Sequence, residues 1–320
     1  MLRATLWGAA LAFLLAVAPA RAADKLVAGA VGGPTATSWP YYIGVEKGFF
    51  AAEGIELDFI YAQTAPGILQ QLTGGSLDFV ATTGLVEPIH AVDKGAPIII
   101  FRVLGQSSPY AMLAKPEIKS LKDLKGKTVT LGGLVDITRI YFDRMMAAQG
   151  LKTGDWDVIV IGATGARFAA LKSGAVDAAM LLPPFSFHAE AAGFPNLGLA
   201  IDYAKDLPFT GLEATRDWAA AHQPQIAGIV RALDKSVAFF KDDAHRQESI
   251  DIMTHAVKLD PADVVKSYDF LRKIDFFAPD ATIHRRQLTS LIKAMQAIGD
   301  IGPGITADRL VMPGLTKLAE

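Results

Sequence analysis

The chain of 320 residues contains no cysteine, and this absence excludes several kinds of chemistry. Disulfide bonds, thiolate metal sites, a cysteine nucleophile and a lipid-carrying cysteine all require this residue. The sequence also contains no Gly-x-Ser-x-Gly, no phosphate-binding Gly-Lys-Ser and no His-Glu-x-x-His motif. Its histidines are scattered and form no metal-ligand spacing: His90, His188, His222, His245, His255 and His284. We therefore expect no catalytic residue, no metal ion and no cofactor.

Long apolar runs are missing from the chain after its first residues. The N-terminus has Arg3, an apolar run from Leu6 to Val17 and an Ala-Arg-Ala cleavage site at residues 20–22, which is typical of a secretory signal peptide. A buried helix or membrane anchor is the alternative, but the run is shorter than the roughly 18 residues that span a bilayer. We predict residues 1–22 as a cleaved leader. Export without a lipid anchor then predicts a soluble, periplasmic protein.

An excess of positive charge is also missing, since 31 basic residues face 33 acidic ones. Loss of the leader would make the chain more acidic. Such a balance lacks the basic surface that binds nucleic acid, so we expect no nucleic-acid partner. Half of the chain is apolar (51%), and its length exceeds what one hydrophobic core usually holds. Two lobes are therefore expected.

Short apolar strands alternate with helical stretches, which predicts an α/β fold with βαβ units and mostly parallel sheets. The first series begins with a strand over residues 25–30 and a helix over 39–52, and it closes with a strand over 98–104. A second series runs from a strand over 128–131 to a strand over 178–182. The pattern is predominantly helical after about residue 217.

The two series share a repeated turn, which indicates duplicated lobes. Residues 72–78 (LTGGSLD) and 171–177 (LKSGAVD) have leucine, glycine and aspartate at equal spacing. In each copy we expect a helix to end at the glycine and a buried strand to start after the aspartate. The alternative is that both segments are ordinary helix-to-strand turns within one large sheet.

Ligands of open α/β sheets bind beyond the carboxyl ends of the strands, where helix N-termini point outward. We therefore predict that the loops after the strands form a binding site. In the first series these loops supply hydroxyl and amide groups, one aromatic ring and one carboxylate. The predicted residues are Thr35, Thr37, Ser38, Trp39, Gln63, Thr64, Thr82, Thr83 and Glu87.

Two of these residues have a second interpretation. The ring of Trp39 is either a flat wall of the site or a part of the core. Glu87 stands three residues before His90, a spacing that is more often a solvated helix face than a metal site. The Glu87 carboxylate alone would meet an amine or hydroxyl group of a ligand.

The second series supplies matching loops at residues 132–139 and 183–187. The predicted residues are Gly133, Asp136, Thr138, Arg139, Pro184 and Phe185. Asp136 or Thr138 would cap a helix, and Arg139 would stand at the start of that helix, where a cation is unfavourable unless an anion is near. With Arg139 as its anchor, the ligand is predicted to carry a carboxylate or sulfonate. An ion pair of Arg139 with Asp136 or Asp143 is the alternative.

Three segments carry a resemblance to a known family. They are residues 46–57 (EKGFFAAEGIEL), the paired Gly-x-[Leu/Val]-Asp turns and residues 121–127 (LKDLKGK). These segments are similar to the substrate-binding proteins of ABC importers for nitrate, sulfonates and taurine, and to related pyrimidine-precursor-binding proteins. The resemblance runs from about residue 25 to the C-terminus and is weakest after about residue 242. None of the three segments identifies the ligand.

The resemblance implies a type II periplasmic-binding-protein fold, in which two Rossmann-like lobes are joined by two crossing segments. We place the crossings at residues 103–112 and 197–211. Lobe 1 then comprises residues 23–107 and 207–320, and lobe 2 comprises residues 108–206. The expected protein is a monomer that captures a small organic anion in the cleft and delivers it to an ABC permease in the inner membrane.

Two other functions occur with such a fold. A periplasmic sensor would bind a ligand in the same cleft and report it to a receptor, and the sequence does not separate sensing from import. An enzyme such as a pyrimidine-precursor synthase is the second alternative. Because the chain has neither catalytic motifs nor the cysteine-rich run of that synthase, we expect no enzyme.

Overall fold

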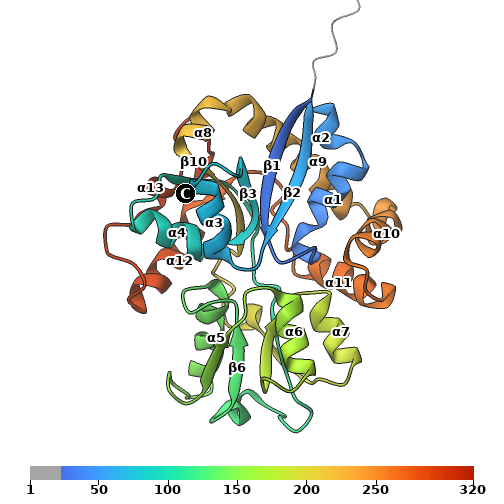
Figure 1. Cartoon of the computed structure of the whole chain (residues 1–320), viewed down its shortest axis with the longest axis vertical. Coiled ribbons are helices and arrows are strands. Elements are labelled where there is room, and N and C mark those ends of the chain that lie inside the picture. The colour runs from blue at the N-terminus through green and yellow to red at the C-terminus, as the bar shows by residue number, and fades with distance from the viewer. Residues whose placement is uncertain (1–22) are drawn as a thin grey trace, which may run out of the picture.

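The computed structural model describes residues 23–320, and the leader predicted at residues 1–22 lies outside them. The chain forms two lobes, one above the other in Figure 1, and each is built on a five-stranded sheet with helices packed around it. This arrangement confirms the predicted α/β class with two lobes. Within residues 23–320 we find no helix with the length and apolar character needed to cross a membrane.

Lobe 1, the upper lobe in Figure 1, has the strand order β2-β1-β3-β10-β4. Strand β1 is parallel to β2 and β3, whereas β10 is antiparallel to β3 and β4. The strands are β1 (Asp24–Val31), β2 (Ile55–Ala62), β3 (Phe79–Gly84), β4 (Ile98–Gly105) and β10 (Thr210–Thr215). A two-stranded sheet near the C-terminus pairs β11 (Ile283–His284) with β12 (Leu318–Ala319).

Ten helices belong to lobe 1 within the described chain. They are α1 (Trp39–Glu46), α2 (Phe49–Ala52), α3 (Ala65–Thr73), α4 (Val86–Asp93), α8 (Arg216–Ala221), α9 (Gln223–Lys241), α10 (Arg246–Val257), α11 (Pro261–Lys273), α12 (Arg285–Ala297) and α13 (Ala307–Leu310). The single helix predicted over residues 39–52 is divided in two. Gly48 adopts a left-handed conformation (φ +68°), which ends α1 and redirects the chain into α2.

Lobe 2 has the strand order β7-β6-β8-β5-β9. Strand β6 is parallel to β7 and β8, whereas β5 is antiparallel to β8 and β9. The strands are β5 (Ala111–Ala114), β6 (Thr128–Leu131), β7 (Asp157–Val160), β8 (Ala178–Leu181) and β9 (Asn196–Leu199). The helices are α5 (Ile137–Ala147), α6 (Thr164–Lys172) and α7 (Phe185–Ala191).

The repeated turn has the same structure in both lobes. The glycine after each helix is left-handed, with φ of +76° and +80°. The backbone N–H of Asp78 donates to the Val27 carbonyl (2.9 Å), and the Asp78 carboxylate accepts from the Val27 N–H (2.7 Å). Asp177 makes the same reciprocal pair with Thr128, at 2.7 and 2.9 Å. Each aspartate therefore fixes the start of its own strand to the neighbouring strand.

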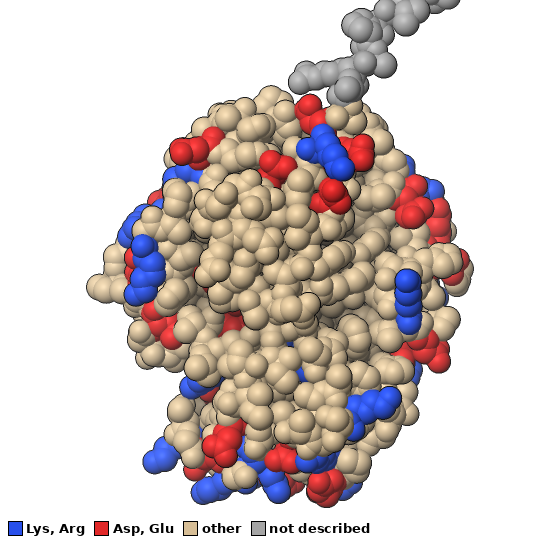
Figure 2. All heavy atoms as spheres, in the orientation of Figure 1, with Lys and Arg blue, Asp and Glu red and all other residues tan. Residues whose placement is uncertain are grey.

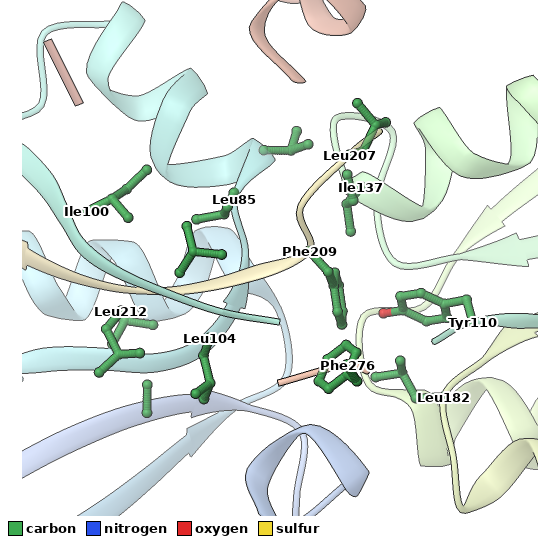
Figure 3. Close-up of a cluster of buried hydrophobic side chains, with 14 of the residues drawn as sticks. Leu85, Ile100, Leu104, Tyr110, Ile137, Leu182, Leu207, Phe209, Leu212 and Phe276 are labelled. Atoms are coloured by element: carbon green, nitrogen blue, oxygen red, sulfur yellow. The ribbon is translucent and has the colours of Figure 1, made fainter. Parts of the chain in front are cut away.

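A buried apolar cluster packs the two crossing segments between the lobes (Figure 3). Phe209, just before β10, lies between Tyr110 and Phe276. Its ring centroid is 5.3 Å from that of Tyr110 and 6.3 Å from that of Phe276. Figure 3 shows Ile137 and Leu182 approaching this cluster from lobe 2. Because these side chains are buried, the crossing segments form a packed junction and not a free linker.

Candidate ligand-binding site

A partly open cavity of about 260 Å³ lies where the two lobes meet. Its walls come from the loops after β1, β2 and β3 of lobe 1 and from the loops after β6, β7 and β8 of lobe 2. These loops follow the carboxyl ends of strands, which is where open α/β sheets bind ligands. On the face shown in Figure 2, charged side chains of both signs lie mainly on the outer parts of the lobes, and the band between the lobes is mostly uncharged.

The lobes touch one another around this cavity. Gly162 of lobe 2 lies so close to the Gln63 carbonyl of lobe 1 that an added Cβ would be 2.1 Å from that oxygen. At the far side, Nδ1 of His188 on α7 lies 2.9 Å from a carboxylate oxygen of Asp263 on α11. The structure is therefore a closed arrangement of the two lobes.

The structure brings many of the predicted side chains to the cavity. Those that line it are Thr35, Thr37, Gln63, Thr82, Thr83, Glu87, Asp136 and Phe185. They come from five separate segments, each at or just after the end of a strand, so only the folded chain assembles them. Their contact with a ligand remains a prediction.

Trp39 does not line the cavity, contrary to the prediction that its ring forms a wall of the site. The ring is completely buried in lobe 1, where it packs edge-on against Phe240 and Tyr268. Its Nε1–H donates to the Ser249 carbonyl at 2.7 Å. Since α1 begins at Trp39, the helix turns this ring toward α10 and α11, and Ser38 is buried beside it outside the cavity lining.

Arg139 does not reach the cavity either, because it forms the ion pair that was the alternative. Its Nε lies 2.7 Å from a carboxylate oxygen of Asp143, one helical turn later. The hydroxyl of Thr138 is engaged inside its own loop, where it accepts from the Gly132 N–H (2.9 Å) and donates to Asp136. Asp136 caps α5 by accepting from the Thr138 N–H. The anion prediction loses the anchor on which it rested.

The remaining predicted residues lie beside the lining but outside it. Thr64 caps α3, with its hydroxyl accepting from the Gly67 N–H at 3.3 Å. Gly133 belongs to the loop that ends at Asp136, and Pro184 directly precedes α7. Their loops contribute lining residues, although these three side-chain positions do not.

Sequence reasoning missed the largest walls of the cavity. Tyr110 and Phe209 stand in the crossing segments and line the cavity together with Phe185. Residues 162–166 (GATGA), the loop after β7 that opens α6, are also in the lining. The sequence contains a signal for each of these two features. The aromatic residues stand in the predicted crossing segments, and the loop contains glycine and threonine directly after a strand.

A pair of carboxyl groups forms one end of the cavity. Glu87 of α4 is 6% exposed, and its carboxyl lies within hydrogen-bonding range of the Asp136 carboxyl of the other lobe. Burial raises the pKa of the Glu87 carboxyl well above its usual range, and the negative charge of Asp136 raises it further. Among the lining residues there is no lysine, arginine or histidine to neutralise them.

The N-terminus of α6 gives another part of the cavity wall a partial positive charge. This N-terminus faces the cavity, and no side chain caps the helix. Below the loop lies Arg167, which is 1% exposed and donates through Nε to the Met180 carbonyl (2.7 Å) and through Nη1 to the Ile161 carbonyl (2.9 Å). Free N–H groups at a helix N-terminus favour an electron-rich ligand atom. The Arg167 guanidinium adds only its positive charge, because its nitrogens already donate to protein oxygens.

The described residues contain no group of three or more histidine, aspartate or glutamate side chains that is arranged to hold a metal ion. The site therefore offers hydrogen bonds, two carboxyl groups and aromatic surfaces. These are means of binding an organic molecule.

The fold and the cavity define a two-lobed protein of the periplasmic-binding-protein class. The family described as NMT1/THI5 like matches residues 35–246, which is more than half of the chain. The chain belongs to this family.

Similar proteins with curated names include binding proteins. The riboflavin-binding protein RibY of Chloroflexus aurantiacus is 32% identical over 129 residues, which cover 39% of this chain and 36% of RibY. The putative binding protein YtlA of Bacillus subtilis is 21% identical over 280 residues, which cover 85% of this chain and 83% of YtlA. The match with RibY thus spans little more than a third of that protein.

Similar solved structures show the same fold. The alkanesulfonate-binding protein SsuA of Xanthomonas axonopodis pv. citri superposes with a TM-score of 0.75 at 17% identity, covering 94% of this chain and 100% of SsuA. The nitrate-binding protein NrtA of Synechocystis PCC 6803 has a TM-score of 0.67 at 15% identity, covering 77% and 70%. The desulfurization enzyme DszB has a TM-score of 0.64 at 13% identity, covering 91% and 97%. The predicted type II fold is confirmed.

Proposed function

We propose that this chain is the solute-binding component of an ABC importer. It captures a small organic molecule between its lobes and delivers it to a permease in the inner membrane. It acts as a periplasmic monomer after loss of the predicted leader. The observation that carries this proposal is the cavity of about 260 Å³ at the carboxyl ends of both sheets. Relatives named as periplasmic binding proteins for sulfonates and nitrate support it.

The ligand of this proposal has an electron-rich end that binds at the N-terminus of α6. A carboxylate, a sulfonate or a carbonyl oxygen would accept hydrogen bonds from the N–H groups of residues 164–166, which line the cavity. The buried guanidinium of Arg167 supports the same end from below. We thus assign the binding of an anionic ligand group to the N–H donors of α6 in place of Arg139.

A thermal-shift screen followed by small-angle X-ray scattering tests the binding function. The screen of residues 23–320 should include sulfonates, carboxylates, nitrate, pyrimidines, flavins and small amines. A ligand at 100 times its dissociation constant is expected to add about 2.7 kcal/mol to the free energy of unfolding. A ligand that binds in the cleft is also expected to reduce the radius of gyration of the protein, because the lobes close around it. If no compound of any charge stabilises or compacts the protein, the proposal fails.

Two further measurements separate import from the alternatives. Mass spectrometry should recover the best ligand unchanged after long incubation, whereas conversion to a product would indicate an enzyme on the same fold, as DszB shows to be feasible. Deletion of the gene should abolish uptake of the labelled ligand. Retained uptake together with a lost transcriptional response would instead indicate a sensor.

A further inference from the structure

Helix α7 of lobe 2 contacts lobe 1 at several points outside the ligand cavity. Just before the helix, the Pro183 carbonyl accepts a hydrogen bond from the Ala36 N–H at 3.0 Å. On the helix, Nδ1 of His188 lies 2.9 Å from a carboxylate oxygen of Asp263 on α11. An ionised carboxylate only accepts hydrogen bonds, so Nδ1 donates in this pair. In Figure 1, α7 and α11 lie on the same side of the molecule, one in each lobe.

An aromatic contact between the same two helices accompanies the polar one. The rings of Phe187 on α7 and Phe270 on α11 meet edge to face, with their centroids 5.9 Å apart. Within lobe 2, the ring of Phe168 on α6 packs edge-on against the His188 ring, with centroids 5.3 Å apart. Opening of the lobes would separate Phe187 from Phe270 and expose apolar surface of both rings. The contact therefore favours the closed form.

The pair of His188 and Asp263 differs in its position from the other ion pairs between described residues. Each of those joins residues of the same lobe or of the crossing segment next to it. The Asp263 side chain is only 3% exposed, so solvent screens this pair less than it screens an ordinary surface pair. The attraction between His188 and Asp263 is thus placed where it acts on the closure of the lobes.

The helix that contacts α11 also forms a wall of the cavity. Phe185 is the first residue of α7 and lines the cavity, whereas Phe187 and His188 lie outside the lining. Because α7 has only seven residues, the cavity wall and the contact with α11 lie within little more than one helical turn. A ligand that packs against Phe185 therefore holds α7 in the position from which it contacts α11.

We propose that α7 is a latch that holds the two lobes closed through its contact with α11. This inference rests on the proposed solute-binding function and adds a device that regulates it. Side chains outside the cavity set the fraction of molecules that are closed, and the apparent affinity for a ligand follows that fraction. Weakening of the latch therefore lowers the affinity for every ligand of the cleft by the same factor.

Small-angle X-ray scattering of the mature chain, residues 23–320, tests the latch after exhaustive dialysis and without any added compound. The variants are His188→Ala, which removes the polar contact, and Phe270→Ala, which removes the aromatic contact from the other lobe. Two matched controls change contacts that lie within lobe 1. His222→Ala removes a histidine that bonds to a backbone carbonyl, and Phe49→Ala removes an edge-to-face aromatic contact.

Both latch variants should have a larger radius of gyration than the wild type, because loss of a charge-assisted hydrogen bond or of the ring contact lowers the ratio of closed to open molecules by about tenfold. Both controls should match the wild type, and circular dichroism should be the same for all five proteins. The His188 side chain is 35% exposed, so His188→Ala is expected to fold and decides the matter alone if Phe270→Ala does not fold.

The latch is wrong if His188→Ala has the radius of gyration of the wild type, or if His222→Ala opens the protein equally. Either result leaves the solute-binding function standing, because the variants change no residue of the cavity lining. That function is tested separately by the thermal-shift screen.

Discussion

Glu213 has no exposed surface, although it stands in the middle of β10. Its carboxyl accepts one hydrogen bond from the Thr83 hydroxyl at 2.9 Å, and burial raises its pKa well above the usual range. A raised folded pKa means that its stabilising contribution is complete below about pH 4.3 and is lost as the pH rises through the folded pKa. Glu213→Gln keeps an acceptor for Thr83 and removes the titration. We expect the variant to gain stability relative to the wild type as the pH is raised from 4.5 to 8, in urea unfolding.

Glu53 supplies a control of opposite sign for this experiment. The hydrogen bond from Arg231 is the main cause that lowers the pKa of the Glu53 carboxyl, and Lys235 adds to it. Its contribution is therefore present above about pH 4.3 and is lost as the pH falls. Glu53→Gln should show no comparable change between pH 4.5 and 8, and its deficit in stability relative to the wild type should shrink only as the pH falls below about 4.3. The same pH trend in both variants would contradict the assignment.

Trp39 is predicted to serve stability and not recognition. Trp39→Phe removes the hydrogen bond to the Ser249 carbonyl and leaves a space between Phe240 and Tyr268. We expect the free energy of unfolding to fall by about 1–3 kcal/mol in denaturant titrations. The affinity for the best ligand of the screen should stay within about twofold, since the ring lies outside the cavity lining. A large loss of affinity with unchanged stability would place the ring at the site after all.

Sequence reasoning at the residue scale found the loops but not the direction of every side chain. Glu87 and Asp136 line the cavity, and both follow strands on the cleft side of their lobes, although their contact with a ligand stays a prediction. Trp39 and Arg139 follow the same rule and yet turn away. Their direction depends on partners far along the chain or one helical turn away, namely Ser249 and Asp143, and a loop pattern does not encode these contacts.

At the scale of elements, the repeated turn is the best defined feature that the sequence predicts. Both copies end a helix at a left-handed glycine and join an aspartate to the neighbouring strand. The short strands β5, β9 and β10 were missed. They lie at the ends of the crossing segments and contain glycine and alanine, so they show neither the length nor the alternation of a typical strand. Strands β5 and β10 run antiparallel to β8 and β3 because the chain enters each sheet there from the other lobe.

The aspartates of the repeated turn should contribute equally to the two lobes. Asp78 also accepts from Nε1 of Trp218 (2.9 Å), and Asp177 accepts from Nζ of Lys115 (2.8 Å). Asp78→Ala and Asp177→Ala each leave a strand N–H without its acceptor, which we expect to lower the free energy of unfolding by about 1–3 kcal/mol. Chemical denaturation measures the effect, and Asp58→Ala on the exposed face of β2 is the control, with a change of at most about 1 kcal/mol. Equal, small effects at all three positions would show that the turn is only a local connection.

At the scale of the whole molecule, closure depends on a glycine at the cavity. A Cβ on Gly162 would lie 2.1 Å from the Gln63 carbonyl oxygen and 3.2 Å from the Thr64 Cα, and both are backbone atoms of the other lobe. Since this backbone is held by β2 and α3, we expect Gly162→Ala to keep the lobes apart. Each lobe retains its own sheet and core, so secondary structure measured by circular dichroism should be unchanged.

The consequence of Gly162→Ala for binding follows from the population of the closed form. Apparent affinity falls in proportion to the fraction of molecules that can close, so a variant that closes in fewer than about 1% of molecules binds about a hundredfold more weakly. In small-angle scattering its radius of gyration should be larger than that of the wild type and should not decrease with the best ligand of the screen. Gly33→Ala is the matched control, because Gly33 also lines the cavity but a Cβ there would meet no atom within 4 Å. If Gly162→Ala compacts with ligand as the wild type does, ligand capture does not require the closed arrangement seen in this structure.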